Sequence, residues 1–315
     1  MLRGLGRIAP LALVLALAVG LVGCSQYGKL QAKRAFKDAN VLYAQQEYKR
    51  AAVLYEEAIT NDPELSVAYF YLANSYDNLF KPSRKGEPEN DAYLTKAIEY
   101  YTKASEKEKD PTLRKRSFEF LVAAYGPDKM NDPSQQEPIV NRMIQLDPQD
   151  ATNYFALANI REQAGDYPKA EEVLLQAKQA RPNDPQVYLQ LAGFYNRQEE
   201  FEKTIEALNQ RAAIEPNNPE AFYTISTYYW DKAYRDFRLK EPEKREFVLK
   251  GIAEVDKALQ LKPDYMEALT YKNLLLRLQA NLEKDTAKQA ALLKEADRLR
   301  DQALDLQKKQ AAGIK

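Results

Sequence analysis

Residues 151–184, which read ATNYFALANIREQAGDYPKAEEVLLQAKQARPND, contain two amphipathic stretches on either side of a turn. Gly165-Asp166-Tyr167 marks that turn, and apolar residues recur at helical spacing before and after it. A pair of short helices like this cannot bury its apolar faces alone, so it needs neighbours of the same kind. The stretch therefore predicts an all-α fold built by stacking helix pairs.

The same pattern recurs along the chain at a fixed interval of 34 residues. A fixed period of this length is the sequence signature of a repeat architecture. Four kinds of position keep the interval through three copies: the prolines Pro148, Pro182 and Pro216; the aromatic residues Tyr154, Tyr188 and Phe222; the apolar residues Leu157, Leu191 and Ile225; and the small residues Ala158, Ala192 and Ser226.

These positions resemble the tetratricopeptide-repeat (TPR) family, whose pattern is W-x₂-L-G-x₂-Y, then A-x₃-F, then P. The resemblance covers nearly all of residues 30–280. It implies a TPR α-solenoid, in which antiparallel helix hairpins stack into a right-handed superhelix. It also implies a scaffold that binds other proteins, with the first helix of each pair lining a concave groove. A fold of this kind does not by itself identify the partner.

We expect residues 30–284 to form about six repeats, two of which carry insertions near residues 77–96 and 231–250. Both insertions fall between the two helices of a pair and lengthen the hairpin. Residues 285–315 are expected to form a C-terminal capping helix, because a terminal repeat needs a polar outer face. A coiled-coil partner helix is the alternative reading of its apolar stripe. That stripe comprises Leu292, Leu293, Ala296, Leu299, Ala303 and Leu306.

The steps Asp184-Pro185 and Asn218-Pro219 predict where two of the helices begin. An Asp or Asn side chain before a helix accepts hydrogen bonds from its first free N–H groups, and proline is well tolerated in the first turn.

The N-terminus has the features of an export signal. A basic start with Arg3 and Arg7 precedes an almost uninterrupted apolar run over residues 8–22. The run ends in Leu21-Val22-Gly23-Cys24, which resembles the lipobox of bacterial lipoproteins. The resemblance implies that residues 1–23 are a signal peptide removed by cleavage before Cys24, and that Cys24 is acylated. An uncleaved membrane anchor is the alternative that hydropathy alone leaves open.

Acylation of Cys24 would attach the mature chain to a lipid bilayer, with residues 24–29 as a short tether. The expected location is the bacterial cell envelope, facing the periplasm. Ser25 follows the cysteine, where aspartate would resemble the signal for inner-membrane retention. The outer membrane is therefore the expected destination.

The composition excludes several classes of chemistry. The chain has no histidine and one cysteine, so His-based triads, His-ligated metals, disulfides within the chain and thiolate clusters are impossible. Basic and acidic residues number 46 each, which gives no reason to expect a nucleic-acid partner. We therefore expect a protein that is not an enzyme and that uses no metal and no cofactor.

Asn40, Asn74 and Asn159 each directly follow the small alanine expected at the contact between helices. The TPR resemblance implies that these three side chains are exposed in the groove. An asparagine amide both donates and accepts hydrogen bonds, so a row of amides suits an extended peptide backbone. The alternative is that they are solvated polar residues on helix surfaces.

Several aromatic residues, Phe36, Tyr43 and Tyr71 among them, accompany the asparagines on or near the same side of the first helices, and four of these are predicted to contact a partner. They are Phe70, Phe155, Tyr223 and Trp230. Large aromatic side chains make good anchors for a partner, because they bury much area at little entropic cost. The chain has 21 tyrosines, however, and packing between repeats is the alternative role for each aromatic residue.

The function predicted from these features is a membrane-anchored periplasmic TPR scaffold or adaptor, which binds other envelope proteins or peptides through its groove. Assembly of an envelope machine is the kind of process such a scaffold would serve. One alternative is a structural subunit that associates with itself. The other is a carboxylate-based hydrolase, but Glu56-Glu57 and Glu171-Glu172 are interpreted as solvated helix faces rather than an acid/base pair.

Overall fold

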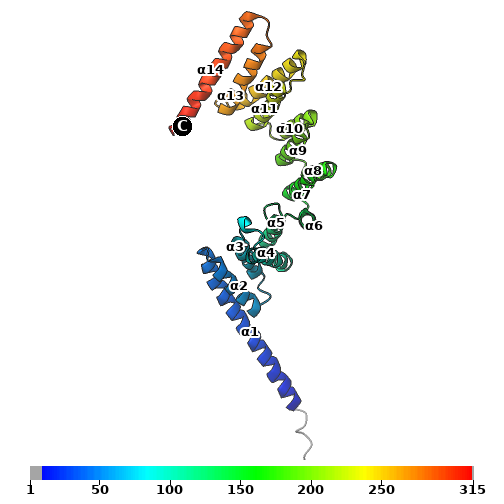
Figure 1. Ribbon diagram of the computed structural model, residues 1–315, viewed down its shortest axis with the longest axis vertical. Helices are drawn as coiled ribbons and strands as arrows, with labels where there is room; N and C mark the ends of the chain where they lie inside the picture. The colour runs from blue at the N-terminus through cyan, green and yellow to red at the C-terminus, as the bar shows by residue number, and fades with distance from the viewer. Residues whose placement is uncertain (1–8, 314–315) are drawn as a thin grey trace, which may run out of the picture. The chain divides into compact units, whose positions relative to one another are not determined.

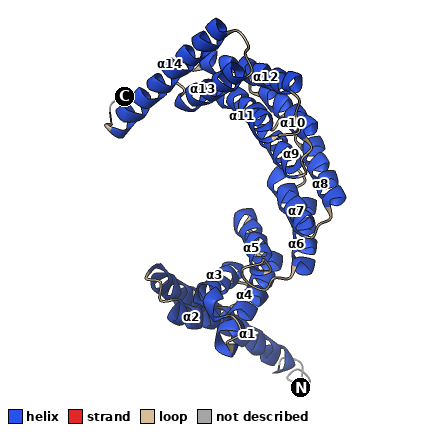
Figure 2. Ribbon diagram, turned by 45° about the horizontal axis from the view of Figure 1, so that its top comes forward, coloured by secondary structure: helices blue, strands red, loops and turns tan. Residues whose placement is uncertain are grey.

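The computed structural model describes residues 9–313, with side chains from Gln26 onward. Within this part of the chain there are 14 α-helices and one short 3₁₀-helix, and no residue is in a strand (Figure 2). The fold is all-α, as the sequence predicts.

The chain divides into two compact units, residues 1–166 and 167–315. In each unit the helices follow one another as hairpins, and each helix packs on the next (Figure 1). The first unit contains α1 (Ala9–Ala44), α2 (Tyr48–Asn61), α3 (Ser66–Leu79), the 3₁₀-helix η1 (Pro82–Arg84), α4 (Pro88–Lys107), α5 (Pro111–Ala124), α6 (Pro133–Leu146) and α7 (Ala151–Gln163). The second contains α8 (Tyr167–Ala180), α9 (Pro185–Arg197), α10 (Phe201–Ile214), α11 (Pro219–Arg235), α12 (Glu241–Leu261), α13 (Met266–Asn281) and α14 (Thr286–Ala311). The right-handed superhelix stays a prediction.

Side-chain caps start many of these helices. Asp184 accepts a hydrogen bond from the backbone N–H of Gln186 at 3.0 Å, and Asn218 accepts one from Glu220 at 3.0 Å. Proline occupies the first helical position in both cases. These bonds satisfy backbone donors that have no partner within the helix. The predicted starts of α9 and α11 are confirmed.

Small residues lie where neighbouring helices approach most closely. The alanines that carry the repeat pattern, Ala39, Ala73, Ala158 and Ala192, are all buried. The second helices bring large side chains to the same core, and Tyr55 of α2 and Tyr101 of α4 are completely buried. Two tyrosines of this size fit there because alanine takes little room on the facing helix.

A tyrosine hydroxyl ties the start of several first helices to the turn before it. The hydroxyl donates to the carbonyl oxygen of the proline six residues earlier, and this bond fixes how the chain enters the next pair. It joins Tyr69 to Pro63 at 3.1 Å, Tyr154 to Pro148 at 3.1 Å and Tyr188 to Pro182 at 2.7 Å. The shared 34-residue spacing of prolines and aromatic residues therefore reflects a hydrogen bond as well as packing.

A second recurring contact joins three helices in each unit. Glu56 of α2 accepts hydrogen bonds from the Tyr76 hydroxyl of α3 at 2.6 Å and from Lys96 Nζ of α4 at 3.4 Å. In the second unit, Glu171 of α8 accepts from the Tyr195 hydroxyl of α9 at 2.9 Å and from Lys203 Nζ of α10 at 3.1 Å. Glu56 and Glu171 therefore hold neighbouring helices together rather than extending freely into solvent as the sequence suggested.

Both insertions lie between the two helices of a pair. In the first, α3 is followed by η1 and an exposed turn at Gly86, and α4 reaches 20 residues. In the second, α11 has 17 residues and α12 has 21, with residues 236–240 between them. The additional residues thus lengthen α4, α11 and α12 beyond the 13 or 14 residues of helices such as α9 and α10.

Helix α1 is continuous from Ala9 to Ala44, so the structure has residues 24–29 in a helix where we expected a short tether before the first helix. No proline lies between Pro10 and Ala44, which permits an unbroken helix. The side chains of residues 1–25, which include the expected signal peptide and Cys24, lie outside the described part of the structure. From Gln26 onward, no helix is both long enough and apolar enough to cross a lipid bilayer.

The last helix, α14, packs on α13 with the predicted stripe. Ala296, Leu299 and Ala303 are buried against Leu269 and Leu276 of α13. The Asp285 side chain caps its start by accepting from the backbone N–H groups of Ala287 and Lys288. One face of α14 therefore closes the apolar core of the second unit.

The buried tyrosines predict how stability depends on alkaline pH. Burial raises the pKa of the Tyr55 and Tyr101 phenols above the usual value near 10. The unfolded chain loses these protons near pH 10, whereas the folded chain keeps them to higher pH. The contribution of these two phenols to the free energy of unfolding is therefore fully present below about pH 10, and it is lost as the pH rises through their pKa values in the folded chain.

We expect the urea midpoint of unfolding to be lower at about pH 11 than at about pH 9. Tyr101→Phe should show a smaller difference between the two midpoints, because one of the responsible phenols is gone. The exposed Tyr234 provides the control, and Tyr234→Phe should behave like the wild type. An unchanged difference in Tyr101→Phe would show that this phenol does not govern the alkaline loss.

Candidate protein-binding surfaces

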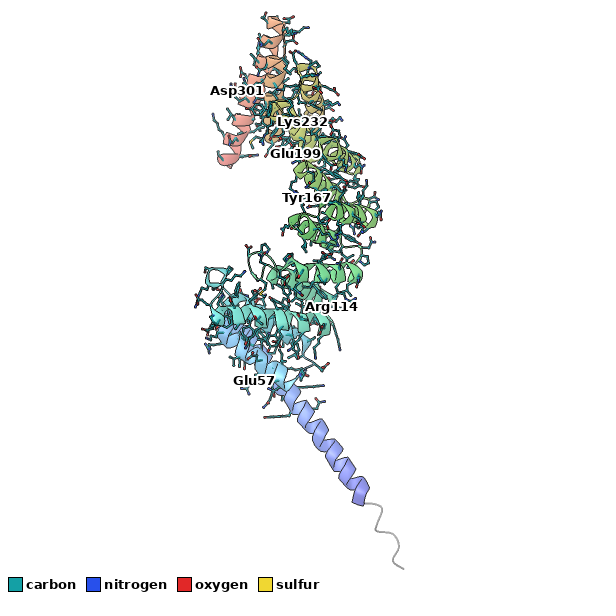
Figure 3. All side chains as sticks on the ribbon, turned by 45° about the vertical axis from the view of Figure 1, so that its right-hand side comes forward. Glu57, Arg114, Tyr167, Glu199, Lys232 and Asp301 are labelled. Carbon is teal, nitrogen blue, oxygen red and sulfur yellow. The ribbon has the colours of Figure 1, made fainter. Side chains whose placement is uncertain are left out.

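In each unit, two first helices of successive pairs lie side by side. In the first unit α3 contacts α5, and in the second α11 contacts α13. The residues that the sequence analysis selected as partner-binding lie on first helices: α1, α3, α7 and α11. Figure 3 shows the side chains of both units, with Lys232 of α11 labelled. We call the surface formed by the first helices of a unit its first-helix face.

Asn74 is buried and not exposed as expected. Its side chain is 7% exposed and lies between three helices. Its Oδ1 accepts hydrogen bonds from the Tyr43 hydroxyl of α1 and from Asn78 Nδ2 at 2.9 Å, and its Nδ2 donates to the Tyr101 hydroxyl of α4 at 3.0 Å. Buried amides need such partners, because an unsatisfied polar group in the core is costly. Asn74 therefore has a role in packing that the sequence analysis did not give it.

The other two asparagines are exposed but differ from each other. Asn40 Oδ1 accepts from the hydroxyl of Tyr55, in the second helix of its own pair, at 2.7 Å. Asn159 Oδ1 accepts only a local bond, from Gln163 Nε2 at 2.7 Å one turn along α7. The three amides are thus not equivalent, and Asn159 is the one whose side chain is bonded within its own helix alone.

Phe70 is also buried, with 5% of its surface exposed. Its ring lies 6.0 Å from the Tyr101 ring and 5.9 Å from the Phe120 ring, both at steep angles. Such edge-to-face contacts are favourable within a core. Phe70 is therefore a packing residue, as the alternative reading allowed, whereas Phe155 on α7 is partly exposed.

Tyr223 and Trp230 belong to a row of aromatic rings across α11 and α13. The Trp230 ring stacks on Tyr234 at 4.9 Å and meets Tyr271 edge-on at 5.6 Å. Tyr223 meets Tyr271 at 5.4 Å and Tyr265 at 5.2 Å. We call these five residues the aromatic ladder. Tyr234 is 59% exposed, and the other four are partly exposed.

Sequence reasoning missed Tyr234, Tyr265 and Tyr271. Tyr234 follows Trp230 by four residues, so both lie on one face of a helix. That signal was present in the sequence, although Tyr234 falls within the expected insertion at residues 231–250. Tyr265 and Tyr271 belong to the next pair and come into contact with α11 only through packing.

The ladder adjoins a pocket of 380 Å³ between α13 and α14. Tyr223 and Tyr271 form part of its wall, and α14 contributes Leu304, Arg300 and Gln307. The burial of Tyr223 raises its pKa to about 12, so the phenol is a neutral hydrogen-bonding group at physiological pH. Aromatic, aliphatic and polar groups thus meet at one place. In the described part of the chain, no cluster of Cys, Asp and Glu side chains could hold a metal ion.

The different surroundings of Asn74 and Asn159 predict different costs of replacement. Asn74→Ala removes hydrogen bonds to Tyr43, Asn78 and Tyr101 in a buried site, so it should lower the free energy of unfolding by about 1–3 kcal/mol. Asn159→Ala should change it by less than about 0.5 kcal/mol. Chemical denaturation of the two variants checks this. Equal effects would contradict the roles that the structure gives the two amides.

The comparisons with known proteins agree with this architecture. The family model for the tetratricopeptide repeat matches residues 131–192. The C-terminal part of a TPR repeat-containing protein from Cytophaga hutchinsonii has a similar structure, with a TM-score of 0.55 and 16% identity over 86% of this chain and 98% of that one. No curated protein matches the sequence.

Two further solved structures resemble the chain more weakly. MamA from Desulfovibrio magneticus, from residue 41 to its end, is 15% identical with a TM-score of 0.40, over 68% of this chain and 96% of that one. A thermophilic TPR protein from Thermus thermophilus is 18% identical with a TM-score of 0.34, over 78% of this chain and 99% of that one. Residues 131–192 thus match the tetratricopeptide repeat, and the sequential helix hairpins of the chain resemble those of a solved TPR structure.

Proposed function

We propose that this protein is a scaffold of the bacterial cell envelope, anchored to a membrane through acylated Cys24, that binds other proteins through the first-helix face of its second unit. The observation that carries the binding proposal is the aromatic ladder. Trp and Tyr are the residues that most often dominate the energy of protein–protein interfaces. Here five of them form one connected surface on α11 and α13.

The ladder offers a partner both apolar area and polar contacts. Trp230 and Tyr234 present stacked rings, and their rigid side chains lose little entropy on binding. The adjoining pocket has the side chains of Thr270, Arg300 and Gln307 at its wall. Together these groups suit an extended peptide or a loop with one apolar side chain in the pocket and its backbone hydrogen-bonded at the rim.

The membrane anchor and the location follow from the N-terminal sequence. Leu21-Val22-Gly23-Cys24 matches the lipobox pattern and contains the single cysteine of the chain. Ser25, in place of aspartate, favours the outer membrane. The partners would then be envelope proteins facing the periplasm, and a scaffold at the membrane could help to assemble them into a larger machine.

The anchoring proposal predicts a specific modification. Metabolic labelling with an alkyne fatty acid should mark the wild-type protein in the membrane fraction, and Cys24→Ser should abolish the label and the cleavage. Mass spectrometry of membrane-extracted wild type should find Cys24 as an acylated N-terminal residue. Recovery of a peptide that joins Met1 to Cys24 would count against it.

The binding proposal predicts that the ladder contacts the partner. A photo-reactive phenylalanine analogue placed at Tyr234 should cross-link to a defined protein in cells, and one placed at the outward-facing Glu57 of α2 should not (Figure 3). With that partner purified, Trp230→Ala should weaken binding by roughly thirtyfold, which corresponds to about 2 kcal/mol.

Phe237→Ala is the matched control, because Phe237 is an aromatic residue of the same unit, is 90% exposed and lies outside the ladder. Binding that survives Trp230→Ala but is lost in Phe237→Ala would place the interface elsewhere. Cross-links from Tyr234 to a second copy of this chain would instead support a self-associating subunit.

A further inference from the structure

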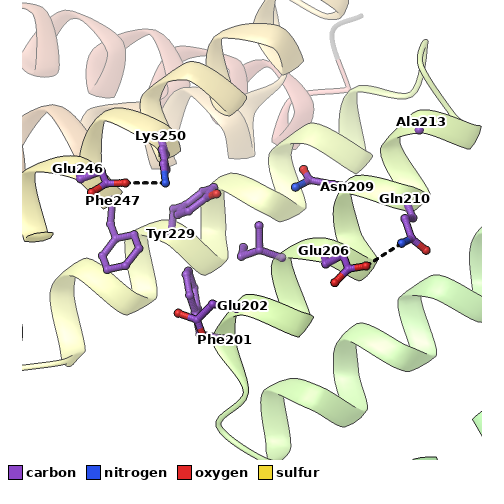
Figure 4. Close-up of a pocket in the computed structure, with 11 residues that line it drawn as sticks. Phe201, Glu202, Glu206, Asn209, Gln210, Ala213, Tyr229, Glu246, Phe247 and Lys250 are labelled. Atoms are coloured by element: carbon purple, nitrogen blue, oxygen red, sulfur yellow. Dashed lines mark hydrogen bonds and ion pairs between the residues drawn. The ribbon is translucent and has the colours of Figure 1, made fainter.

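The second unit has another groove, on the second helices rather than the first. It has a volume of 640 Å³, runs between α10 and α12, and has Tyr229 of α11 at its base (Figure 4). Phe201, Tyr229 and Phe247 gather at one end, and Asn209, Gln210 and Ala213 lie toward the other. From Phe201 to Ala213 the wall on α10 is roughly 18 Å long, given the rise of an α-helix.

The insertion near residues 231–250 builds one wall of this groove. Three residues of α12 contribute to the groove: Glu246 and Phe247 lie in its additional turns, and Lys250 lies just after them. Gly251 then holds α12 tightly against its neighbours, because an added Cβ would lie 3.1 Å from Tyr229 Cβ and 2.9 Å from Leu275 Cδ2. A regular repeat without the insertion would lack Glu246 and Phe247 in this wall.

Three aromatic rings form the apolar end of the groove. Phe201 lies 5.3 Å from Phe247 and 5.8 Å from Tyr229, in both cases edge to face, and Tyr229 lies 6.2 Å from Phe247. All three rings are partly exposed. This cluster already attracts a cation of the chain itself, since Lys232 Nζ lies 5.4 Å from the centre of the Phe201 ring.

The rim of the groove is acidic. Glu202, Glu206 and Glu246 are exposed along it, and Lys250 is the single cation among its lining residues. Lys250 is bonded to Glu246 at 2.7 Å, and Glu206 accepts a bond from Gln210 at 3.2 Å. Lys232 over the Phe201 ring is itself bonded to Asp236 at 3.0 Å, so the carboxylates at the groove still outnumber the ammonium groups. The groove therefore repels anions and favours cations.

We propose that this groove binds a basic segment of a partner protein. A lysine or arginine of that segment lays its methylene stem on Ile205 and the rings, and its charge lies among Glu202, Glu206 and Glu246. The length of the groove suits several residues of a chain rather than a single amine. The groove is separate from the aromatic ladder, so an experiment on the groove tests this proposal independently of the proposed function.

The probe is a fluorescent nine-residue peptide with lysine at every third position and alanine elsewhere. Binding to the full-length protein is measured by fluorescence anisotropy, beside peptides with norleucine or glutamate in place of lysine. We expect the lysine peptide to bind, the other two to bind at least roughly tenfold more weakly, and the affinity to fall with added salt.

The test variant combines Glu202→Gln, Glu206→Gln and Glu246→Gln. A control variant removes three negative charges from glutamates that do not line the groove. The control is Glu57→Gln with Glu99→Gln and Glu172→Gln. Its three residues are exposed, Glu99 is bonded to Lys103 as Glu246 is to Lys250, and Glu172 accepts from Gln176 as Glu206 does from Gln210.

We expect the test variant to lose roughly tenfold or more in affinity and the control to stay within roughly twofold of the wild type. Phe247→Leu, which keeps an apolar side chain but removes the ring, should cost roughly threefold. A carbodiimide should join the peptide's lysines to the three groove glutamates. The proposal is overturned if the wild type does not bind the lysine peptide, if the control loses as much as the test variant, or if the cross-links lie elsewhere.

Discussion

The close approach of neighbouring helices at small side chains is the constraint on which the rest of this structure depends. Ala39, Ala73 and Ala192 are completely buried at these contacts, and a larger residue there would push the helices apart. In the lengthened pair α11 and α12, Gly251 has the same role. Because each pair makes the same contact with the next, the small residue must return at a fixed interval. For this reason the repeat can be recognised from the sequence alone.

Features that depend on nearby residues could therefore be predicted from the sequence. The starts of α9 and α11 follow from capping residues beside prolines, and the capping helix from the apolar stripe that ends in Leu306. Contacts made by a distant helix could not. Asn74 and Asn159 each follow an alanine at the same position of the repeat. Asn74 is bonded to Tyr101 of the second helix of its pair, but the equivalent position in the second helix after Asn159 is Leu174, which offers no hydrogen bond. The dipeptide alone does not distinguish a buried amide from an exposed one.

The insertions show the same limit. Their position between the two helices of a pair was predicted from the sequence, but the surfaces that they form depend on packing. The additional turns of α11 bring Tyr234 onto Trp230, and those of α12 bring Phe247 beside Phe201. In both cases inserted residues complete a surface whose remaining members belong to the regular repeat. An insertion here changes the chemistry of two faces without disturbing the register between pairs.

These two faces share one helix. Tyr229 at the base of the groove and Trp230 in the ladder are adjacent on α11, about 100° apart around its axis. If binding at one face rotated α11, the side chains of the other face would therefore move as well. Val248, Val255 and Leu275 are completely buried around this helix, and a core packed to that density resists such rotation. If both proposed surfaces bind partners, they should therefore do so without strong coupling, and a partner on the aromatic ladder would leave the proposed basic segment in place.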